Sequence, residues 1–226
     1  MVGTFGNVGT FSFCQDKIMT TAGEGGMVIT NDQKIAETIW SYKDHGKSFQ
    51  TRQRLRGDGT FKFVHDICGT NLRMSELHAA VGRHQLRALP SWVKARRDNA
   101  KAIAVGLSKE KALIFYPEPD NVHGSFYRLY AFIDSSSLAP NWNRDRIVRE
   151  LVAEGTPVGI GSCGVVYKEK AFQHYRSQTF CPNAEYAHNQ SLAFLVHPTL
   201  RQATINRTIE RAVAKLNEAR DLRSAA

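Results

Sequence analysis

Residues 9–30 read GTFSFCQDKIMTTAGEGGMVIT, and this stretch decides the interpretation of the chain. It places one lysine, Lys17, between an aromatic, β-branched run and the glycine-rich turn 23–26, with the hydroxyl of Ser12 five residues earlier. A lysine held against apolar walls has its charged form disfavoured, so its amine becomes nucleophilic and can form a Schiff base with an aldehyde. From the residues alone, a solvated lysine beside an ordinary hairpin turn stays open as the alternative.

The elements next to this stretch are predicted from their periodicity. Residues 8–13 and 27–30 mix β-branched and aromatic side chains and predict two strands. Residues 33–43 place apolar side chains at helical spacing and predict an amphipathic helix. Residues 44–71 are rich in Gly and Arg and predict a loop. Ser75 is the expected N-cap of the next helix.

Pro90 is expected to end that helix, and a second helix is expected to follow to about residue 107. Beyond it, residues 126–133, 156–160 and 191–196 predict short strands, and residues 144–154 and 206–222 predict helices. Short strands with helices on one face are typical of a small α+β domain. We place the domain boundary near residue 105.

Composition limits the classes of protein that remain. The chain has 226 residues, of which 42% are hydrophobic, so the composition is that of a globular protein. No stretch approaches the roughly 18 consecutive apolar residues of a membrane span. Residues 1–7 carry neither a basic nor an apolar signal region, so a cytoplasmic location is expected.

The cysteines and the charge are less specific. Cys14, Cys68, Cys163 and Cys181 lack zinc-ligand spacing, so we expect no metal site and expect small buried side chains instead. The formal net charge of +9 suits an anionic partner, and its densest segment lies at residues 52–62. A solvated loop is the favoured interpretation of that segment, and nucleic-acid binding is the weaker one, because no nucleic-acid-binding motif accompanies it.

Four segments carry a resemblance to a known family. FSFCQDKIMTTAGEGGMVITND at 11–32 resembles the signature around the Schiff-base lysine of the DegT/DnrJ/StrS aminotransferases, which aminate sugar nucleotides. DHG at 44–46 is similar to the family's His-Gly pair, and GTNLRMSEL at 69–77 to its G-x-N-x-R-M helix entry. HPTL at 197–200 resembles its late H-P-x-L. The lysine segment and the Asn-x-Arg-Met segment are specific in combination.

The resemblance implies a cofactor and a set of roles. Lys17 is expected to form the Schiff base with pyridoxal phosphate and to move the proton between carbons. Ser12 is expected to bind the cofactor phosphate, and Asn71 to reach the phosphate of the neighbouring subunit of a homodimer with a shared active site. The roles of His45 and Glu24 stay open. Some relatives carry histidine in place of the lysine and perform dehydration or deoxygenation, so Lys17 favours transamination.

The expected fold class is α/β, as an incomplete fold-type I aminotransferase. Residues 1–105 are expected to be the end of the large pyridoxal-phosphate-binding domain, and residues 106–226 a small α+β C-terminal domain. The resemblance begins in the middle of the family's pattern, so we expect an N-terminal portion to be missing and the chain alone to be inactive. The expected substrates are a keto sugar attached to a nucleotide and an amino-acid donor, glutamate. The alternative is a non-catalytic fragment or subunit-like module that acts by binding a partner.

Overall fold

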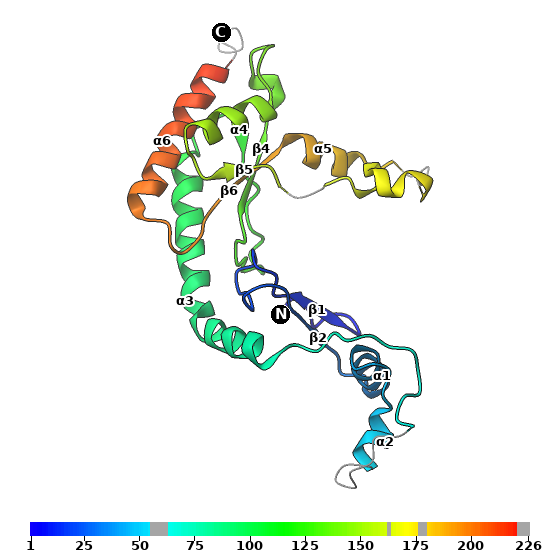
Figure 1. Cartoon of the computed structure of the whole chain (residues 1–226). Helices are drawn as coiled ribbons and strands as arrows, with labels where there is room; N and C mark the ends of the chain where they lie inside the picture. Colours follow the sequence, from blue (N-terminus) through cyan, green and yellow to red (C-terminus); the bar gives the residue numbers. More distant parts are fainter. Residues whose placement is uncertain (55–62, 162–163, 176–179, 221–226) are drawn as a thin grey trace. The chain divides into compact units, whose positions relative to one another are not determined.

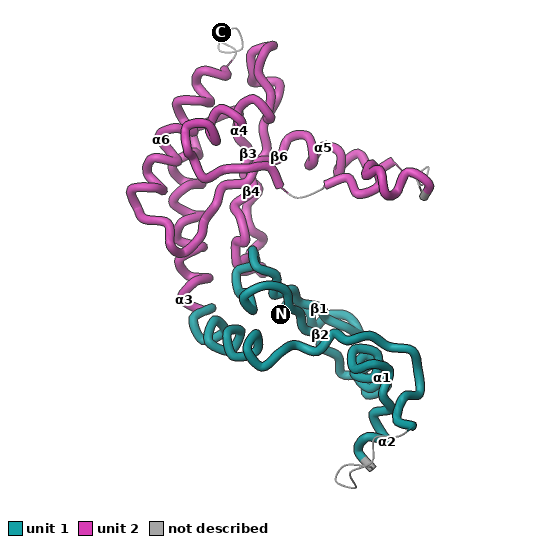
Figure 2. The backbone as a smooth tube through the Cα atoms, in the orientation of Figure 1, with its two compact units in different colours: residues 1–89 teal, residues 90–226 magenta. Residues whose placement is uncertain are grey.

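The computed structural model describes residues 1–54, 63–161, 164–175 and 180–220. The chain falls into two compact units, residues 1–89 and 90–226 (Figure 2). The domain boundary near residue 105 stays a prediction. Most of the basic segment 52–62 lies outside the described residues, as does Cys163.

Unit 1 begins with a two-stranded antiparallel sheet. Strands β1 (Gly9–Ser12) and β2 (Gly26–Ile29) pair so that Gly9 faces Ile29 and Ser12 faces Gly26. Helix α1 (Gln33–Lys43) follows and is capped by Asp32, whose side chain accepts a hydrogen bond from the backbone of Ile35. These three elements confirm the predicted strands and helix.

Two later expectations for this part of the chain were wrong. A short helix, α2 (Phe49–Arg54), lies within the segment expected to be a loop. Helix α3 (Glu76–Gly106) runs without interruption through Pro90, although a break was expected there. A proline inside a helix removes one backbone hydrogen bond and costs about 3 kcal/mol. Ala and Arg are frequent on both sides of Pro90 and favour helix strongly enough for it to continue through the proline.

Unit 2 is built on a four-stranded antiparallel sheet. Its strand order is β3 (Leu113–Ile114), β4 (Leu129–Ile133), β6 (Ser191–Phe194), β5 (Val158–Gly159). The part of α3 from Pro90 onward packs with helices α4 (Arg144–Ala153) and α6 (Gln202–Ala219) on the sheet (Figure 1). Antiparallel strands with these three helices packed on one face agree with the predicted small α+β arrangement, and the bounds of that domain stay a prediction.

The hydrophobic core of unit 2 lies between that sheet face and the three helices. Inward-facing side chains alternate along β4, where Leu129, Ala131 and Ile133 are buried and Tyr130 is exposed. The helices contribute Ile103, Ile147, Leu151, Ile205 and Leu216, and Leu107 adds to them just after the end of α3.

The opposite face of the sheet meets a helix that was not predicted. Helix α5 (Pro182–Gln190) contacts β4 and β6, and its Tyr186 ring stacks on Phe132 of β4 with centroids 6.0 Å apart. Three 3₁₀ segments, η1 (Ser135–Ser137), η2 (Val166–Lys168) and η3 (Lys170–Tyr175), were also not predicted. Their sequences carry too few apolar residues to show a helical period.

Unit 1 contrasts with unit 2 in its burial. Among its described residues, Val64 is the one buried large apolar side chain. Large apolar side chains are instead exposed on its strands and loops and at the start of α3: Phe5, Val8, Phe11, Met27, Val28, Ile67, Leu72, Met74 and Leu77. The fold of unit 1 therefore depends on backbone and side-chain hydrogen bonds more than on apolar burial.

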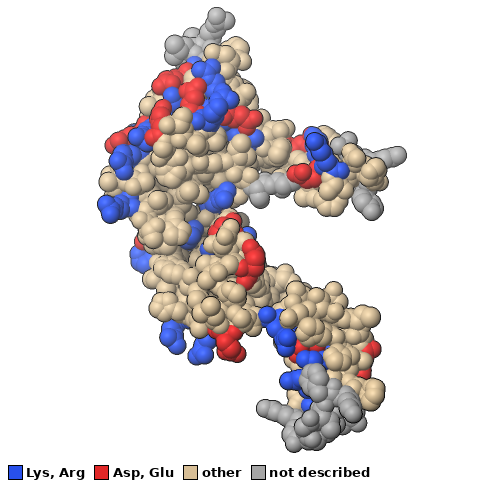
Figure 3. All heavy atoms as spheres, in the orientation of Figure 1, with Lys and Arg blue, Asp and Glu red and all other residues tan. Residues whose placement is uncertain are grey.

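The surface bears on the expectations for the cysteines, for the charge and for a membrane span. Cys68 and Cys181 are exposed free thiols, so the expected burial of the cysteines was wrong for both. On the face shown in Figure 3, basic and acidic side chains lie intermixed over unit 2. Within the described residues, no helix is both long enough and apolar enough to cross a membrane.

Candidate active site

Lys17 lies in the turn between β1 and β2. The chain leaves β1 at Ser12, and the amide of Phe13 donates to the carbonyl of Gly25 across 2.7 Å. The amide of Lys17 donates to the carbonyl of Cys14 at 3.1 Å, which closes a tight turn around the lysine. After Lys17 the chain runs back toward the end of β1, where the amide of Thr21 donates to the carbonyl of Phe13 at 3.1 Å. The position of the Lys17 backbone is therefore fixed from both sides.

Thr21 is the buried centre of this turn. Its side chain is 1% exposed, and its hydroxyl donates to the carbonyl of Glu24 at 3.1 Å. A Cβ on Gly25 would collide with that hydroxyl oxygen, so this position needs a residue without a side chain. The backbone of Glu24 thus helps to hold the turn. The amide of Thr20 donates to Oε1 of Gln85 on α3 at 2.9 Å and ties the turn to that helix.

The side chain of Lys17 is exposed to solvent and lies near a carboxylate. It is 40% exposed, and its Nζ lies 3.8 Å from Oδ1 of Asp16. The sequence predicted apolar walls around Lys17. This prediction was wrong for the described residues of unit 1, which leave the side chain exposed. The amine is accessible to a ligand that approaches from solvent.

Ser12 lies at the end of β1 with an exposed side chain. Its Oγ accepts a hydrogen bond from the amide of Cys14 at 3.4 Å. A serine hydroxyl accepts and donates, so the hydrogen of Ser12 remains available to an anionic oxygen. Ser12 and Lys17 thus belong to one strand and turn.

Asn71 belongs to a second polar cluster in unit 1. It forms a β-bridge with Asp44, just after the end of α1. Its side-chain oxygen accepts from the backbone amide and from Nε of Arg73, and His45 lies on the other side of that arginine. The sequence predicted Asn71 as a site residue and left the role of His45 open. It did not indicate that both contact Arg73.

Asp44 is the buried anion of this cluster. Its Oδ1 lies 3.1 Å from Nζ of Lys47 and 3.5 Å from NH1 of Arg73. Burial raises the pKa of the Asp44 carboxyl, but the hydrogen bond and charge of Lys47 and the charge of Arg73 outweigh it and hold the pKa below its usual value. Sequence reasoning missed Asp44 and Lys47. Their i, i+3 spacing was the signal that could have suggested the pair.

A strained turn positions the cluster. His45 and Gly46 both have positive φ, at 64° and 79°. A Cβ on Gly46 would collide with the carbonyl oxygen of Ile67, so the loop at 66–69 packs directly on its backbone. The DHG segment is therefore a structural requirement of the cluster as well as a sequence motif.

The residues present fit a group that carries an aldehyde and a phosphate. The chemistry of the donor set supports this fit: Lys17 offers an accessible primary amine, and Ser12 and Asn71 offer neutral hydrogen-bond donors to phosphate oxygens. Ser12 and Lys17 come together on one hairpin, whereas Asn71 belongs to the cluster around Asp44. No group of three or more metal-ligating side chains occurs in the part of the chain that the structure describes.

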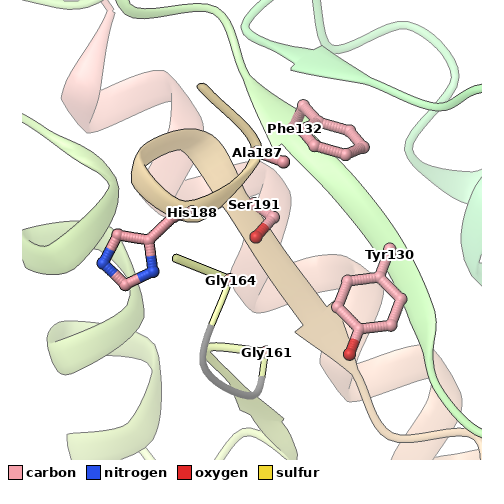
Figure 4. Close-up of a pocket in the computed structure, with 7 residues that line it drawn as sticks. All are labelled: Tyr130, Phe132, Gly161, Gly164, Ala187, His188 and Ser191. Carbon is pink, nitrogen blue, oxygen red and sulfur yellow. The ribbon is translucent and has the colours of Figure 1, made fainter. Parts of the chain in front are cut away.

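A separate pocket lies in unit 2. Its volume is about 200 Å³, and Tyr130 and Phe132 of β4 form one wall while Ala187 and His188 of α5 form another (Figure 4). Gly161, Gly164 and Ser191 complete the lining. Ser12, Lys17 and Asn71 do not line it, so it is distinct from the residues predicted to carry the chemistry.

Comparison with known proteins identifies the family. The model of the DegT/DnrJ/EryC1/StrS aminotransferase family matches residues 1–213. The chain belongs to this family. Its members are enzymes, and the α/β aminotransferase fold is shared by solved structures that resemble the chain.

Two relatives and one structure show the range of similarity. The chain is 31% identical over 210 residues to UDP-N-acetyl-3-dehydro-alpha-D-glucosamine 3-aminotransferase of Acidithiobacillus ferrooxidans, which is 91% of this chain and 50% of that protein. It is 36% identical over 99 residues to GDP-perosamine synthase of Escherichia coli O157:H7, covering 44% and 24% of the two chains. An aminotransferase from Psychrobacter cryohalolentis matches with a TM-score of 0.89 and 38% identity, over 96% of this chain and 58% of that chain. The chain thus spans about half the length of a curated relative that it matches along nearly its whole length.

Proposed function

We propose that this chain is the C-terminal portion of a pyridoxal-phosphate-dependent aminotransferase of the sugar-nucleotide type. The reaction moves an amino group from glutamate to a keto sugar attached to a nucleotide, in the cytoplasm. The observation that carries the proposal is the pairing on one hairpin of an accessible lysine amine, Lys17, with an exposed hydroxyl, Ser12. Members of the family with nucleotide-sugar names, such as the two relatives above, support the substrate class.

Pyridoxal phosphate, when bound, supplies an aldehyde that takes up amines and a ring that stabilises negative charge at the reacting carbon. Lys17 would provide the amine that holds this group, and its Nζ would accept and return the proton at the reacting carbon. The backbone hydrogen bonds around Lys17 fix the point from which its side chain extends. Asp16, 3.8 Å from that nitrogen, helps to orient it before the cofactor binds.

Ser12 and Asn71 bind and orient the phosphate in this proposal. Hydrogen bonds to a charged phosphate are stronger than those between neutral groups, so two neutral donors suffice to fix its position. Lys17 and Ser12 act on the cofactor bound to their own subunit. Asn71 acts on the cofactor of the neighbouring subunit in a homodimer.

Covalent labelling tests the role of Lys17. The purified chain is mixed with pyridoxal phosphate, reduced with borohydride and mapped by mass spectrometry. We expect the label on Lys17 at substoichiometric cofactor, and we expect Lys17→Ala to remove it while Lys34→Ala, on the exposed face of α1, leaves it unchanged. A label spread over surface lysines and unaffected by Lys17→Ala would contradict the proposal.

A second candidate function is supported by the exposed apolar residues of unit 1. Phe11, Met27 and Val28 on β1 and β2 are 38%, 53% and 44% exposed. Exposed apolar strands favour pairing with another polypeptide. In this alternative the chain is a non-catalytic, subunit-like module that acts by binding a partner. Size-exclusion chromatography and amino-donor turnover of this chain and of a polypeptide equivalent to the N-terminal portion of its relatives, alone and mixed, distinguish the two candidates. Turnover that appears on mixing favours the first, and a complex without turnover favours the second.

A further inference from the structure

Backbone hydrogen bonds on both sides of Asn71 fix the position of its backbone. The amide of Thr70 donates to the carbonyl of Tyr42 at 2.8 Å, and the amide of Leu72 donates to the carbonyl of Lys43 at 2.9 Å. Asn71 lies between them and bridges to Asp44. The orientation of the side-chain amide is therefore the variable that decides what Asn71 presents to a ligand.

Arg73 determines that orientation. Oδ1 of Asn71 accepts from the backbone amide of Arg73 at 3.4 Å and from its Nε at 3.1 Å. An arginine side chain has donors and no acceptor, so a rotated amide would place its NH₂ group against other donors. The oxygen must face Arg73, and both N–H groups of Asn71 then point away from it.

Arg73 is in turn held by two other residues. Its NH2 lies 3.3 Å from Nε2 of His45, and its NH1 lies 3.5 Å from Oδ1 of Asp44. The guanidinium only donates, so in this contact Nε2 of His45 is the acceptor. The side chain of Arg73 is 48% exposed, yet all three of its nitrogens have a partner within the cluster.

We propose that Arg73 is a positioning residue that holds the amide of Asn71 with both N–H groups directed at a phosphate monoester. The inference rests on the proposed function, because that phosphate is the one of the cofactor that Asn71 binds. Asn71, His45 and Asp44 each take one donor of Arg73, and in this proposal Arg73 acts on the phosphate through the amide of Asn71. Without Arg73 the amide rotates, and its oxygen competes with its N–H groups for the side that faces the anion.

The affinities for pyridoxal phosphate and for pyridoxal, which lacks the phosphate, test the role. We expect the wild-type chain to prefer pyridoxal phosphate, and Arg73→Met to lower this preference about tenfold, as expected for one misoriented hydrogen bond to a charged group. Arg73→Lys keeps the charge but lacks the planar guanidinium with its several N–H donors, and we expect it to behave like Arg73→Met. Arg87→Met, an exposed arginine on α3, is the matched control and leaves the preference unchanged.

The double variant Asn71→Ala/Arg73→Met distinguishes positioning from direct contact. If Arg73 acts only through Asn71, adding Arg73→Met to Asn71→Ala lowers the preference no further. Losses that multiply would overturn the inference, as would a preference that Arg73→Met leaves intact. A wild-type chain that binds both compounds equally would overturn the proposed phosphate site and the inference with it.

Nuclear magnetic resonance tests the same contact without any cofactor. The side-chain NH₂ group of Asn71 gives a pair of amide signals in a ¹⁵N-labelled sample. We expect Arg73→Met to shift these signals and to bring them toward the values of a freely rotating side chain, with the backbone signals of α1 unchanged. Side-chain signals that do not move would overturn the inference even if cofactor binding had changed.

Discussion

The ammonium of Lys215 on α6 lies 3.1 Å from Oε2 of Glu150 on α4, although the lysine side chain is only 9% exposed. The same Nζ lies 3.2 Å from Glu154 and 2.8 Å from Glu218. The hydrogen bonds to these three carboxylates outweigh the effect of burial and raise the pKa of Lys215, so it remains charged across the ordinary pH range. One buried cation thus joins two helices of unit 2.

Replacing this lysine with an apolar residue should destabilise unit 2. Lys215→Met leaves three carboxylates close together without their shared cation, and we expect a loss of about 2 kcal/mol in the free energy of unfolding. The measurement is urea denaturation followed by circular dichroism. Glu218→Gln is the control, because Glu218 is 56% exposed and its pair should contribute only about 0.5 kcal/mol. Equal effects of the two variants would contradict the central role of Lys215.

The acid dependence of the same network has a defined sign. Hydrogen bonds from Arg146 and then Lys215 lower the pKa of Glu150 in the folded chain. A carboxyl with a lowered folded-state pKa contributes stability above its unfolded-state pKa and loses it as the pH falls through the folded-state value. The stability difference between wild type and Lys215→Met should therefore shrink as the pH falls below the ordinary glutamate pKa of 4.5. Urea titrations at a series of acid pH values measure it, and a difference that grows toward low pH would contradict the argument.

Asp44 should be essential to the fold of its cluster in unit 1. Asp44→Asn leaves the buried ammonium of Lys47 without its anion, and we expect a local destabilisation of about 3 kcal/mol. Hydrogen exchange at the amide of Gly46, which donates to Ser41 at 2.7 Å, reports it. In the wild type this contribution is present above pH 3.8, the ordinary pKa of the carboxyl, and is lost as the pH falls through the lower folded-state value. Unchanged protection in Asp44→Asn would show that the ion pair is dispensable.

Gly46 should not tolerate a side chain. Gly46→Ala combines a positive φ with a Cβ placed against the carbonyl of Ile67, and we expect a loss of at least about 2 kcal/mol in local stability. Gly6→Ala is the matched control in the same unit, because its nearest contact is 4.0 Å away, at the carbonyl of Val8. Hydrogen exchange of residues 44–47 compares them. Similar protection in both variants would contradict the close approach of the two loops.

Gln85 should stabilise the turn that carries Lys17. Gln85→Ala removes the acceptor for the amide of Thr20, and we expect about 1 kcal/mol less local stability, which is a roughly fivefold loss of exchange protection at that amide. Gln85→Glu retains an oxygen acceptor and should restore most of the protection. Equal protection in both variants would mean that the contact does not hold the turn.

Local patterns predicted more of the fold than of the candidate site. Helix α1 was predicted at its observed ends, because Ile35 and Ile39 repeat at helical spacing. Its cap, Asp32, was not predicted. Helix α5 was missed, since PNAEYAHNQ has few apolar residues and its ring contact with the sheet is a single stacked pair, Phe132 and Tyr186. The continuity of α3 through Pro90 depends on the helical preference of the flanking residues, which outweighs one lost hydrogen bond.

In the candidate site too, local motifs predicted some residues and missed others. Lys17, Ser12 and Asn71 stand out by motif, and their roles remain predictions. The cluster of Asp44, Lys47 and Arg73 depends on chain segments that are brought together by the β-bridge between Asp44 and Asn71. A contact between side chains that are far apart in the sequence leaves no periodic signal in one sequence.

The scarcity of apolar burial in unit 1 has a practical consequence for handling the protein. Residues 1–89 contain Lys17 and the Asp44 cluster but bury one large apolar side chain among their described residues, whereas the extended core belongs to residues 90–226. Polar contacts open at lower denaturant than a packed core does. Local unfolding around Lys17 and the Asp44 cluster and global unfolding should therefore be separate events, and a sharp melting curve reports the core of residues 90–226 rather than the state of these residues.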